Sequence, residues 1–284
     1  KDIWIQPASG DAGGALGGAL SVWYKELNKP RTVNPNDSMK GSYLGPLYVQ
    51  DSIEKELLDC GAKFDSVAED DMIEQTAQAL ADAKAIGWFQ GRMEFGPRSL
   101  GGRSILGDPR SEQMQKTLNL KVKYRESFRP FAPSVLREDI TKWFELDYDS
   151  PYMLLVDDVR KDKRIEMTKE EESLFGIDKL NIKRSSIPAV THVDYSARIQ
   201  TVHKETNPKY HALITKFKEK TGCSVVVNTS FNVRGEPIVC TPEDAFRCFM
   251  GTELDLLVVG NCVLRKERQD KSLIEDYKVR YELD

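Results

Sequence analysis

Hydrophobic and polar residues follow two different periods along this chain, which indicates a mixture of helices and strands. Helical spacing is clearest at residues 71–84, where Ile73, Ala77, Leu80 and Ala81 fall on one face. The other predicted helices span residues 15–27, 51–60, 112–120, 139–144 and 210–220, and the predicted strands span 3–7, 85–89, 152–156, 187–193, 224–228, 256–260 and 262–265. Because strands and helices alternate, we expect an α/β fold.

One further helix is predicted from its first residues alone. Thr241 is suited to the N-cap, Pro242 to the first helical position, and Glu243 and Asp244 to the first turn. The glycine-rich stretch 9–14, by contrast, is expected to be a turn between the first strand and the first helix.

Two stretches without periodicity suggest the domain organisation. Residues 28–47 are rich in proline, asparagine and glycine, which is typical of a linker, so we place one unit at 1–46 and a second at 47–284. Residues 160–181 alternate in charge and are expected to be a solvated insertion. The charged tail at 266–284 is expected to form a terminal helix.

Composition narrows the class of protein. With 40% hydrophobic and 30% charged residues among 284, the chain is neither disordered nor of low complexity. Its apolar runs, such as 256–259, are too short to cross a bilayer, and a net charge of −4 gives no bulk attraction to nucleic acid or anionic membranes. Five cysteines without a Cys-x-x-Cys pair indicate reduced thiols in a cytoplasmic protein. Because the chain opens on an apolar segment without an initiator methionine, we expect a piece of a longer protein.

Positive charge is concentrated in one window. Residues 91–137 hold seven arginines, three lysines and four acids, a balance of +6, so the remainder carries −10. Many of these cations sit among glycine, proline and phenylalanine at 91–98 and 123–131, where stiff loops hold a guanidinium ready to bind phosphate through two hydrogen bonds. Scattered surface ion pairs and an RNA-binding patch are the alternatives, and the acidic remainder of the chain disfavours RNA.

A polar run follows a short β-branched strand near residue 227. Asn228, Thr229, Ser230 and Asn232 bring hydroxyls, amides and backbone N–H groups to the carboxyl end of that strand, where ligands bind in α/β sheets. An ordinary Asx or Ser turn explains these residues about as well. Arg198 is expected to lie just after another strand and to supply a further cation.

These segments together resemble the NodU/CmcH family of carbamoyltransferases. The resemblance covers almost the whole chain apart from the charged insertion and the tail, and it is most specific at residues 91–110, 121–135, 188–202 and 225–244. Residues 224–237 are also similar to the Ser-Thr-Ser-Ala-Asn-type turn of YrdC-like domains. The resemblance implies a YrdC-like domain with a twisted mixed sheet, preceded by a short remnant of an actin/Hsp70-like domain similar to the tRNA threonylcarbamoyl transferases.

The resemblance also implies a reaction. Carbamoyl phosphate supplies the carbamoyl group, and ATP, with Mg²⁺, converts it to carbamoyl adenylate in the YrdC-like domain. The preceding domain of the same protein, with bound iron or another divalent metal, then passes the carbamoyl group to a hydroxyl of a small-molecule or sugar acceptor. In this chain, we expect only the adenylation half.

Site residues follow from the matching positions. The catalytic set implied by the resemblance is Lys123, Arg129 and Ser230, with Lys123 and Arg129 holding the carbamoyl donor and the α-phosphate. Arg98 and Arg198 are expected to hold the polyphosphate. The remaining implied ligands of the nucleotide or carbamoyl oxygens are Asn228 and Asn232.

Two positions qualify the resemblance. Asp11, in the glycine turn, matches a metal ligand of the family, but the chain has no His-x-x-x-His, so Asp11 is at best one arm of an incomplete site. Tyr195 stands where glycine is common, a position from which it would reshape the donor pocket. A threonylcarbamoyl-adenylate synthase and a non-catalytic nucleotide- or RNA-binding module remain the alternative functions.

Overall fold

The computed structural model describes residues 5–33, 37–180 and 182–274. Its helices are α1 (Asp11–Ser21), α2 (Gln50–Asp59), α3 (Glu69–Ala81), α4 (Met114–Lys121), α5 (Ile140–Trp143), α6 (Lys169–Glu172), α7 (Ile177–Leu180), α8 (Pro208–Thr221) and α9 (Pro242–Met250). Its strands are β1 (Asp65–Ser66), β2 (Ile86–Phe89), β3 (Arg103–Gly107), β4 (Ala132–Leu136), β5 (Leu155–Asp158), β6 (Ser196–Val202), β7 (Val225–Ser230), β8 (Leu256–Val259) and β9 (Cys262–Arg265).

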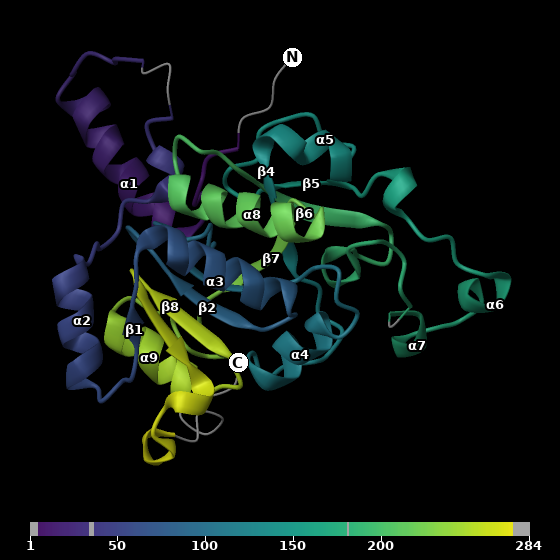
Figure 1. Cartoon of the computed structure of the whole chain (residues 1–284). Coiled ribbons are helices and arrows are strands. Elements are labelled where there is room, and N and C mark those ends of the chain that lie inside the picture. Colours follow the sequence, from purple (N-terminus) through teal and green to yellow (C-terminus); the bar gives the residue numbers. More distant parts are fainter. Residues whose placement is uncertain (1–4, 34–36, 181, 275–284) are drawn as a thin grey trace.

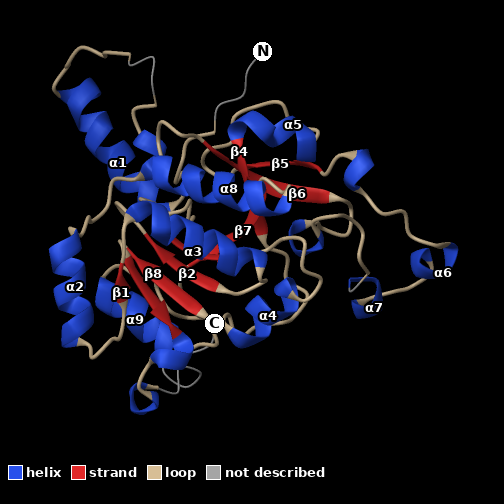
Figure 2. Ribbon diagram, viewed as in Figure 1, coloured by secondary structure: helices blue, strands red, loops and turns tan. Residues whose placement is uncertain are grey.

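All of these strands join one mixed sheet, in the order β1-β9-β8-β2-β3-β7-β4-β6-β5. The β2–β8 and β4–β6 pairs are parallel, and the other neighbouring pairs are antiparallel. Figures 1 and 2 show the strands as one twisted layer with helices packed on it. The predicted α/β class with a mixed sheet is therefore confirmed.

Helices α3 and α8 pack side by side over the near face of the sheet in Figure 1, and α9 lies behind β8. Each helix buries one apolar stripe, such as Met72, Ile73 and Leu80 of α3. In α9, the Thr241 hydroxyl accepts the N–H of Asp244 while the Asp244 carboxylate accepts the N–H of Thr241, which forms the predicted cap.

Several predicted elements are wrong or displaced. The apolar run 187–193 is no strand: Pro188–Val190 makes a single helical turn, and the strand follows at β6. Proline lacks the N–H that a ladder requires, and the partly polar β6 shows no apolar run that would reveal it. The strands β3 and β4 were missed for a similar reason, because they begin at Arg103 and at Ala132-Pro133.

The chain ends differ as well. Residues 1–4 and 275–284 lie outside the described residues, and 5–7 form no strand. The expected turn at 9–14 is partly helical, since α1 begins at Asp11 and continues into a π-helical turn at Val22–Glu26. In place of a terminal helix, the described part of the tail has two short turns, Lys266–Arg268 and Lys271–Leu273.

The charged insertion, whose described residues are 160–180, lies at the surface of the molecule. Figure 1 shows that residues 160–180, with the short helices α6 and α7, extend away from the sheet. Among the described residues, no helix has both the length and the apolar character needed to span a bilayer.

Candidate functional site

The basic window and the polar run after residue 227 meet at one cavity, which we call the arginine cavity. Its volume is about 170 Å³, and three guanidinium-bearing residues line it, Arg98, Arg125 and Arg198. No carboxylate is among the described residues of its wall. The remaining lining residues are Pro97, Ser99, Pro130, Phe131, Ala132, Met153, Asn228, Thr229 and Ser230.

Arg98 lies on an exposed loop whose backbone N–H groups bind a buried carboxylate. The buried carboxylate of Glu94 accepts three N–H groups through Oε1: Leu100 at 2.7 Å, Gly102 at 2.6 Å and Arg103 at 3.3 Å. Gly101 has φ +106°, and a Cβ there would stand 2.2 Å from the Tyr210 ring. The loop is therefore fixed by a charge and by a position that only glycine fits.

Arg198 is not at a strand end as predicted but within β6, where it is paired with Val156 of β5. Its Nε is buried and has no hydrogen-bond partner among the described residues. Burial and the nearby charge of Arg98 both lower the pKa of Arg198. Two guanidinium groups thus lie in one cavity wall that has no acid among its described residues, an arrangement that an incoming anion would stabilise.

Asn228 joins three segments behind the cavity. Its Nδ2 lies 3.0 Å from the Ser99 carbonyl oxygen, 3.0 Å from Ser134 Oγ and 2.8 Å from Gln200 Oε1. Because Ser99 O can only accept, the orientation of the amide is fixed, and its Oδ1 faces away from that carbonyl. The predicted strand end at 228 is wrong: β7 continues to Ser230, so Asn228 is part of the sheet.

Lys123 lies behind Ser230 rather than in the wall of the arginine cavity. Its Nζ donates to oxygens of Ser230 (O at 2.5 Å, Oγ at 3.1 Å) and of Asn232 (Oδ1 at 2.7 Å, O at 2.9 Å). The Ser230 hydroxyl also donates to Asn232 Oδ1 at 2.6 Å. Burial, with repulsion from Arg125, lowers the pKa of Lys123 to about 7. Lys123 therefore shapes the Ser230–Asn232 turn, and its predicted phosphate contact remains a prediction.

Three buried polar atoms of the residues that line the cavity have no partner among the described residues: Ser99 Oγ, Arg198 Nε and Asn228 Oδ1. An unsatisfied buried polar group costs about 1–3 kcal/mol, and such groups in native proteins usually meet a ligand, ion or water. They comprise a donor, an acceptor and a hydroxyl, all on residues of the cavity wall. This set is consistent with a ligand that carries both anionic oxygens and an N–H group.

The arginines on the loop at 125–131 divide into one that lines the cavity and one that does not. Arg125, which the sequence reasoning missed as a ligand, lines the cavity, and burial together with the nearby Arg129 lowers its pKa to about 10. Arg129 is half exposed and forms a 3.0 Å ion pair with Glu126. In the sequence, the feature that could have indicated Arg125 as a ligand is its position two residues after Lys123 in the basic window.

Asp11 is exposed at the start of α1, and no group of three or more His, Cys, Asp or Glu side chains with metal-binding geometry occurs in the described parts of the chain. The described residues therefore do not form a complete metal site around Asp11.

Tyr195, expected to reshape the donor pocket, does not line the arginine cavity. It has φ +67°, the left-handed backbone that glycine adopts easily, and its ring packs under Arg164 at 4.9 Å.

With this geometry in place, comparison with known proteins identifies the family. The family described as "Carbamoyltransferase C-terminus" matches residues 77–266, which include every residue of the arginine cavity. This chain belongs to that family.

Several curated relatives match nearly the whole chain. They include an uncharacterized protein of Synechocystis, sll1178 (58% identical, 100% of this chain, 47% of the relative), the nodulation protein NolO of Bradyrhizobium diazoefficiens (42%, 93% and 45%), and the 3'-hydroxymethylcephem-O-carbamoyltransferase of Streptomyces clavuligerus (33%, 94% and 44%). The chain spans a little under half the length of these relatives. A crystal structure of full-length HypF with phosphate and nucleotide overlaps at a TM-score of 0.42 with 18% identity, over 81% of this chain and 30% of that one, which is too low to define the fold.

Proposed function

We propose that this chain forms carbamoyl adenylate from ATP and a carbamoyl group derived from carbamoyl phosphate. It would do so as one half of a longer ATP-dependent O-carbamoyltransferase that delivers the group to a hydroxyl of a small molecule or sugar. The observation that carries this proposal is the arginine cavity, where Arg98, Arg125 and Arg198 converge without an acid among the described lining residues.

The proposed step is an attack on the α-phosphate of ATP. Water first cleaves carbamoyl phosphate to carbamate and inorganic phosphate. A carbamate oxygen then forms a bond to the α-phosphorus, the bond from that phosphorus to the β-phosphate oxygen breaks, and pyrophosphate leaves. Negative charge gathers on the α-phosphate and on the leaving group. Fixed guanidinium groups stabilise that charge more strongly than they stabilise the bound substrate, which is how such a site accelerates the reaction.

The residues divide into two roles. Arg98 and Arg198 would bind polyphosphate oxygens, with Arg125 as a further cation on the opposite loop. The Ser230 hydroxyl, which accepts from Lys123 and donates to Asn232, would turn its proton from Asn232 Oδ1 to a carbamoyl or phosphate oxygen when the ligand binds. Lys123 thus acts mainly by positioning.

The free oxygen of Asn228 supports a carbamoyl group in particular. Asn228 Oδ1 is a buried acceptor without a partner among the described residues. The NH₂ group of a carbamate can donate to it, whereas acetate offers no donor. Carbamate is already a nucleophile, so this step needs no separate base.

The wider setting belongs to the same proposal. The fold would be YrdC-like, ATP would bind with Mg²⁺, and a metal-binding domain in the preceding half of the protein would carry out the transfer in the cytoplasm. The cephem relative is an O-carbamoyltransferase named for a hydroxymethyl acceptor, which supports a hydroxyl acceptor here.

Pyrophosphate exchange tests the proposal. With this chain, labelled pyrophosphate should appear in ATP only when carbamoyl phosphate is present. Exchange that requires threonine and bicarbonate instead would favour a threonylcarbamoyl-adenylate synthase. If there is no exchange but RNA binds with steep salt dependence, the chain is a binding module and the proposal is wrong.

A further inference from the structure

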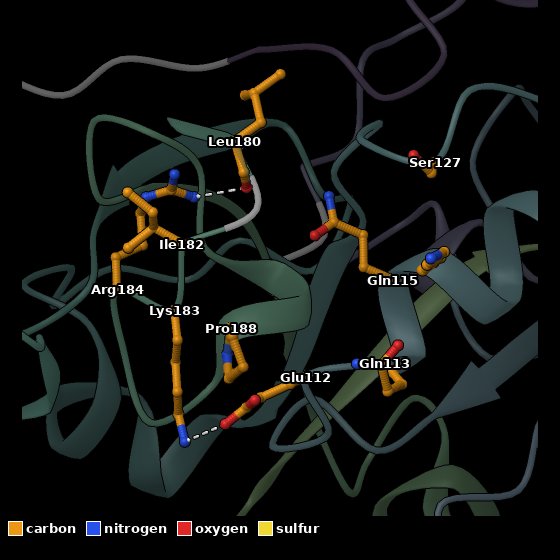
Figure 3. A pocket seen from close by; sticks show the side chains of 10 residues that line it. Glu112, Gln113, Gln115, Ser127, Leu180, Ile182, Lys183, Arg184 and Pro188 are labelled. Carbon is orange, nitrogen blue, oxygen red and sulfur yellow. Dashed lines mark hydrogen bonds and ion pairs between the residues drawn. The ribbon is translucent and has the colours of Figure 1, made fainter. Parts of the chain in front are cut away.

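A second cavity, of about 250 Å³, lies beside the arginine cavity and is separate from it. Its walls come from the start of α4 and the two residues before it, from the loop that carries Ser127, and from residues 180 and 182–188 (Figure 3). No residue of this second cavity lines the arginine cavity, and the proposed reaction makes no use of it.

The charge of the second cavity is positive. Among its lining residues are Lys116, Lys183 and Arg184, with Glu112 as the acid. Lys183 pairs with Glu112 at 2.8 Å, and both side chains are substantially exposed at 44% and 58% (Figure 3). Lys116 and Arg184 therefore contribute two positive charges without a carboxylate partner among the described residues.

Arg184 is the most informative of these residues. It is 5% exposed, and within the described residues its guanidinium donates to two main-chain carbonyls, those of Lys179 and, at 3.4 Å, Leu180. Its buried Nε has no partner in the part of the chain that the structure describes. Part of this arrangement is structural, because these carbonyls end the short helix α7 and arginine satisfies such groups.

That structural role leaves most of the guanidinium unused. Arginine has five N–H donors, and the two carbonyls take two of them. Burying a cation without an opposite charge costs several kcal/mol in real proteins, a cost that a bound anion offsets. Burial accordingly lowers the pKa of Arg184.

We propose that this second cavity binds a small phosphate-type oxyanion, free or as the head of a small phosphate ester. Arg184 would supply the fork that binds two oxygens, Lys116 would supply a second charge, and the Ser127 hydroxyl would supply a neutral donor. The volume exceeds that of a single water and falls below the roughly 300–1,000 Å³ of drug-sized pockets, which suits an anion of this size.

The site adjoins the loop that supplies Arg125. Gln115, in the wall of the second cavity, donates to the carbonyl oxygens of Phe128 at 2.9 Å and Arg129 at 3.2 Å. An anion bound against Ser127 would thus contact the same loop from which Arg125 reaches the arginine cavity. The proposal itself requires only anion binding, so it does not depend on the proposed enzymatic activity.

Counting phosphate sites tests the proposal. Because the arginine cavity also attracts phosphate, the measurement is calorimetric titration of inorganic phosphate into the whole chain carrying Arg198→Gln. The arginine cavity is then weakened, and the tighter of the remaining phosphate sites should be the second cavity. Adding Arg184→Gln should weaken that tighter site by about tenfold or more, as expected for losing charge-assisted hydrogen bonds. Pyrophosphate and glycerol phosphate, titrated in parallel, separate free phosphate from an ester as the natural ligand.

Substitutions at exposed residues of the second cavity test the proposal independently, in case Arg184→Gln disturbs folding. Lys116→Gln should weaken phosphate binding about threefold, and Glu112→Gln should strengthen it by a similar factor, since it removes a competing carboxylate and frees Lys183. Lys161→Gln, an exposed charge change on the 160–181 insertion and outside the cavity wall, is the matched control and should have no effect. If Lys116→Gln and Glu112→Gln leave phosphate binding unchanged, the second cavity is not an anion site, whatever the ATP measurements show.

Discussion

The ammonium nitrogen of Lys123 lies 2.7 Å from Oδ1 of Asn232 and 2.9 Å from the carbonyl oxygen of the same residue. With two further oxygens of Ser230, these contacts enclose a buried cation directly behind the arginine cavity. A ligand would therefore meet the Ser230 hydroxyl, and Lys123 would act on it through the turn that it holds. This relationship leads to a measurable pH dependence.

The stability of the chain should rise with pH just above neutrality because of Lys123. Its pKa in the folded chain is about 7, against 10.5 for a free lysine. Below pH 7 both states bind the proton, whereas from about pH 7 to 8.5 the unfolded chain keeps a proton that the folded chain loses. The unfolded state then binds more protons, so the free energy of unfolding should increase, by on the order of 1 kcal/mol.

Denaturant titrations of the wild type and of Lys123→Met across this range measure the effect. Lys266, whose pKa burial lowers to about 8, contributes with the same sign but is present in both chains and cancels in the difference. If the free energy of unfolding changes equally with pH in the wild type and in Lys123→Met, the pKa of Lys123 is not lowered and burial does not have the expected effect.

Arginines that line the cavity should matter more for ATP binding than Arg129. Arg98→Gln and Arg198→Gln each remove a guanidinium from the wall of the arginine cavity and should weaken ATP binding about tenfold or more. Arg129→Gln removes an exposed cation paired with Glu126 and should weaken it by no more than about threefold. Calorimetric titration at constant ionic strength measures all three, and an equal loss at each position would point to a diffuse positive surface.

Glu94 should be required for stability although it touches no ligand. Glu94→Gln replaces a carboxylate that accepts three N–H groups, and it also removes the nearby negative charge that favours the buried Arg103 cation. We expect the free energy of unfolding to fall by about 1–3 kcal/mol. Glu112→Gln, at an exposed surface position, is the matched control and should change it by less than about 0.5 kcal/mol. Equal denaturant midpoints for the two variants would show that Glu94 is not the anchor of the Arg98 loop.

The sequence predicted the convergence of cations with the Ser230 turn, because arginine-rich loops and a polar run after a buried strand are local patterns. It could not distinguish Arg125, which lines the cavity, from Arg129, which does not. The two residues lie four positions apart in an irregular loop, where no helix or strand period indicates which way a side chain points. Arg103 shows the same limit. It stood in the basic window as one cation among many, yet it is fully buried, with its guanidinium 3.5 Å from the centroid of the Phe89 ring.

The strand errors have a related cause. β6 contains Ser196, Gln200 and Thr201, which are buried and hydrogen-bonded within the fold, so its polar composition hides a core strand. The neighbouring β4 includes Pro133, although it lies between β7 and β6 inside the sheet. Polar groups that find partners only in the folded chain cannot be recognised from spacing.

Two substitutions of Asn228 separate the effect of charge from the effect of hydrogen bonding at the candidate site. Asn228→Ala removes the donors to Ser99 and Gln200, whereas Asn228→Asp removes the same donors and adds a carboxylate within the arginine cavity. Both variants should lose about 1–3 kcal/mol of unfolding free energy, because the same acceptors are left without their donor. Only Asn228→Asp should also neutralise the field of the arginines, so its ATP affinity should fall about tenfold below that of Asn228→Ala. Denaturant titration and calorimetry on both proteins measure the two effects separately. Equal ATP affinities would mean that phosphate does not bind near Asn228, and the arginine cavity would then not be the nucleotide site.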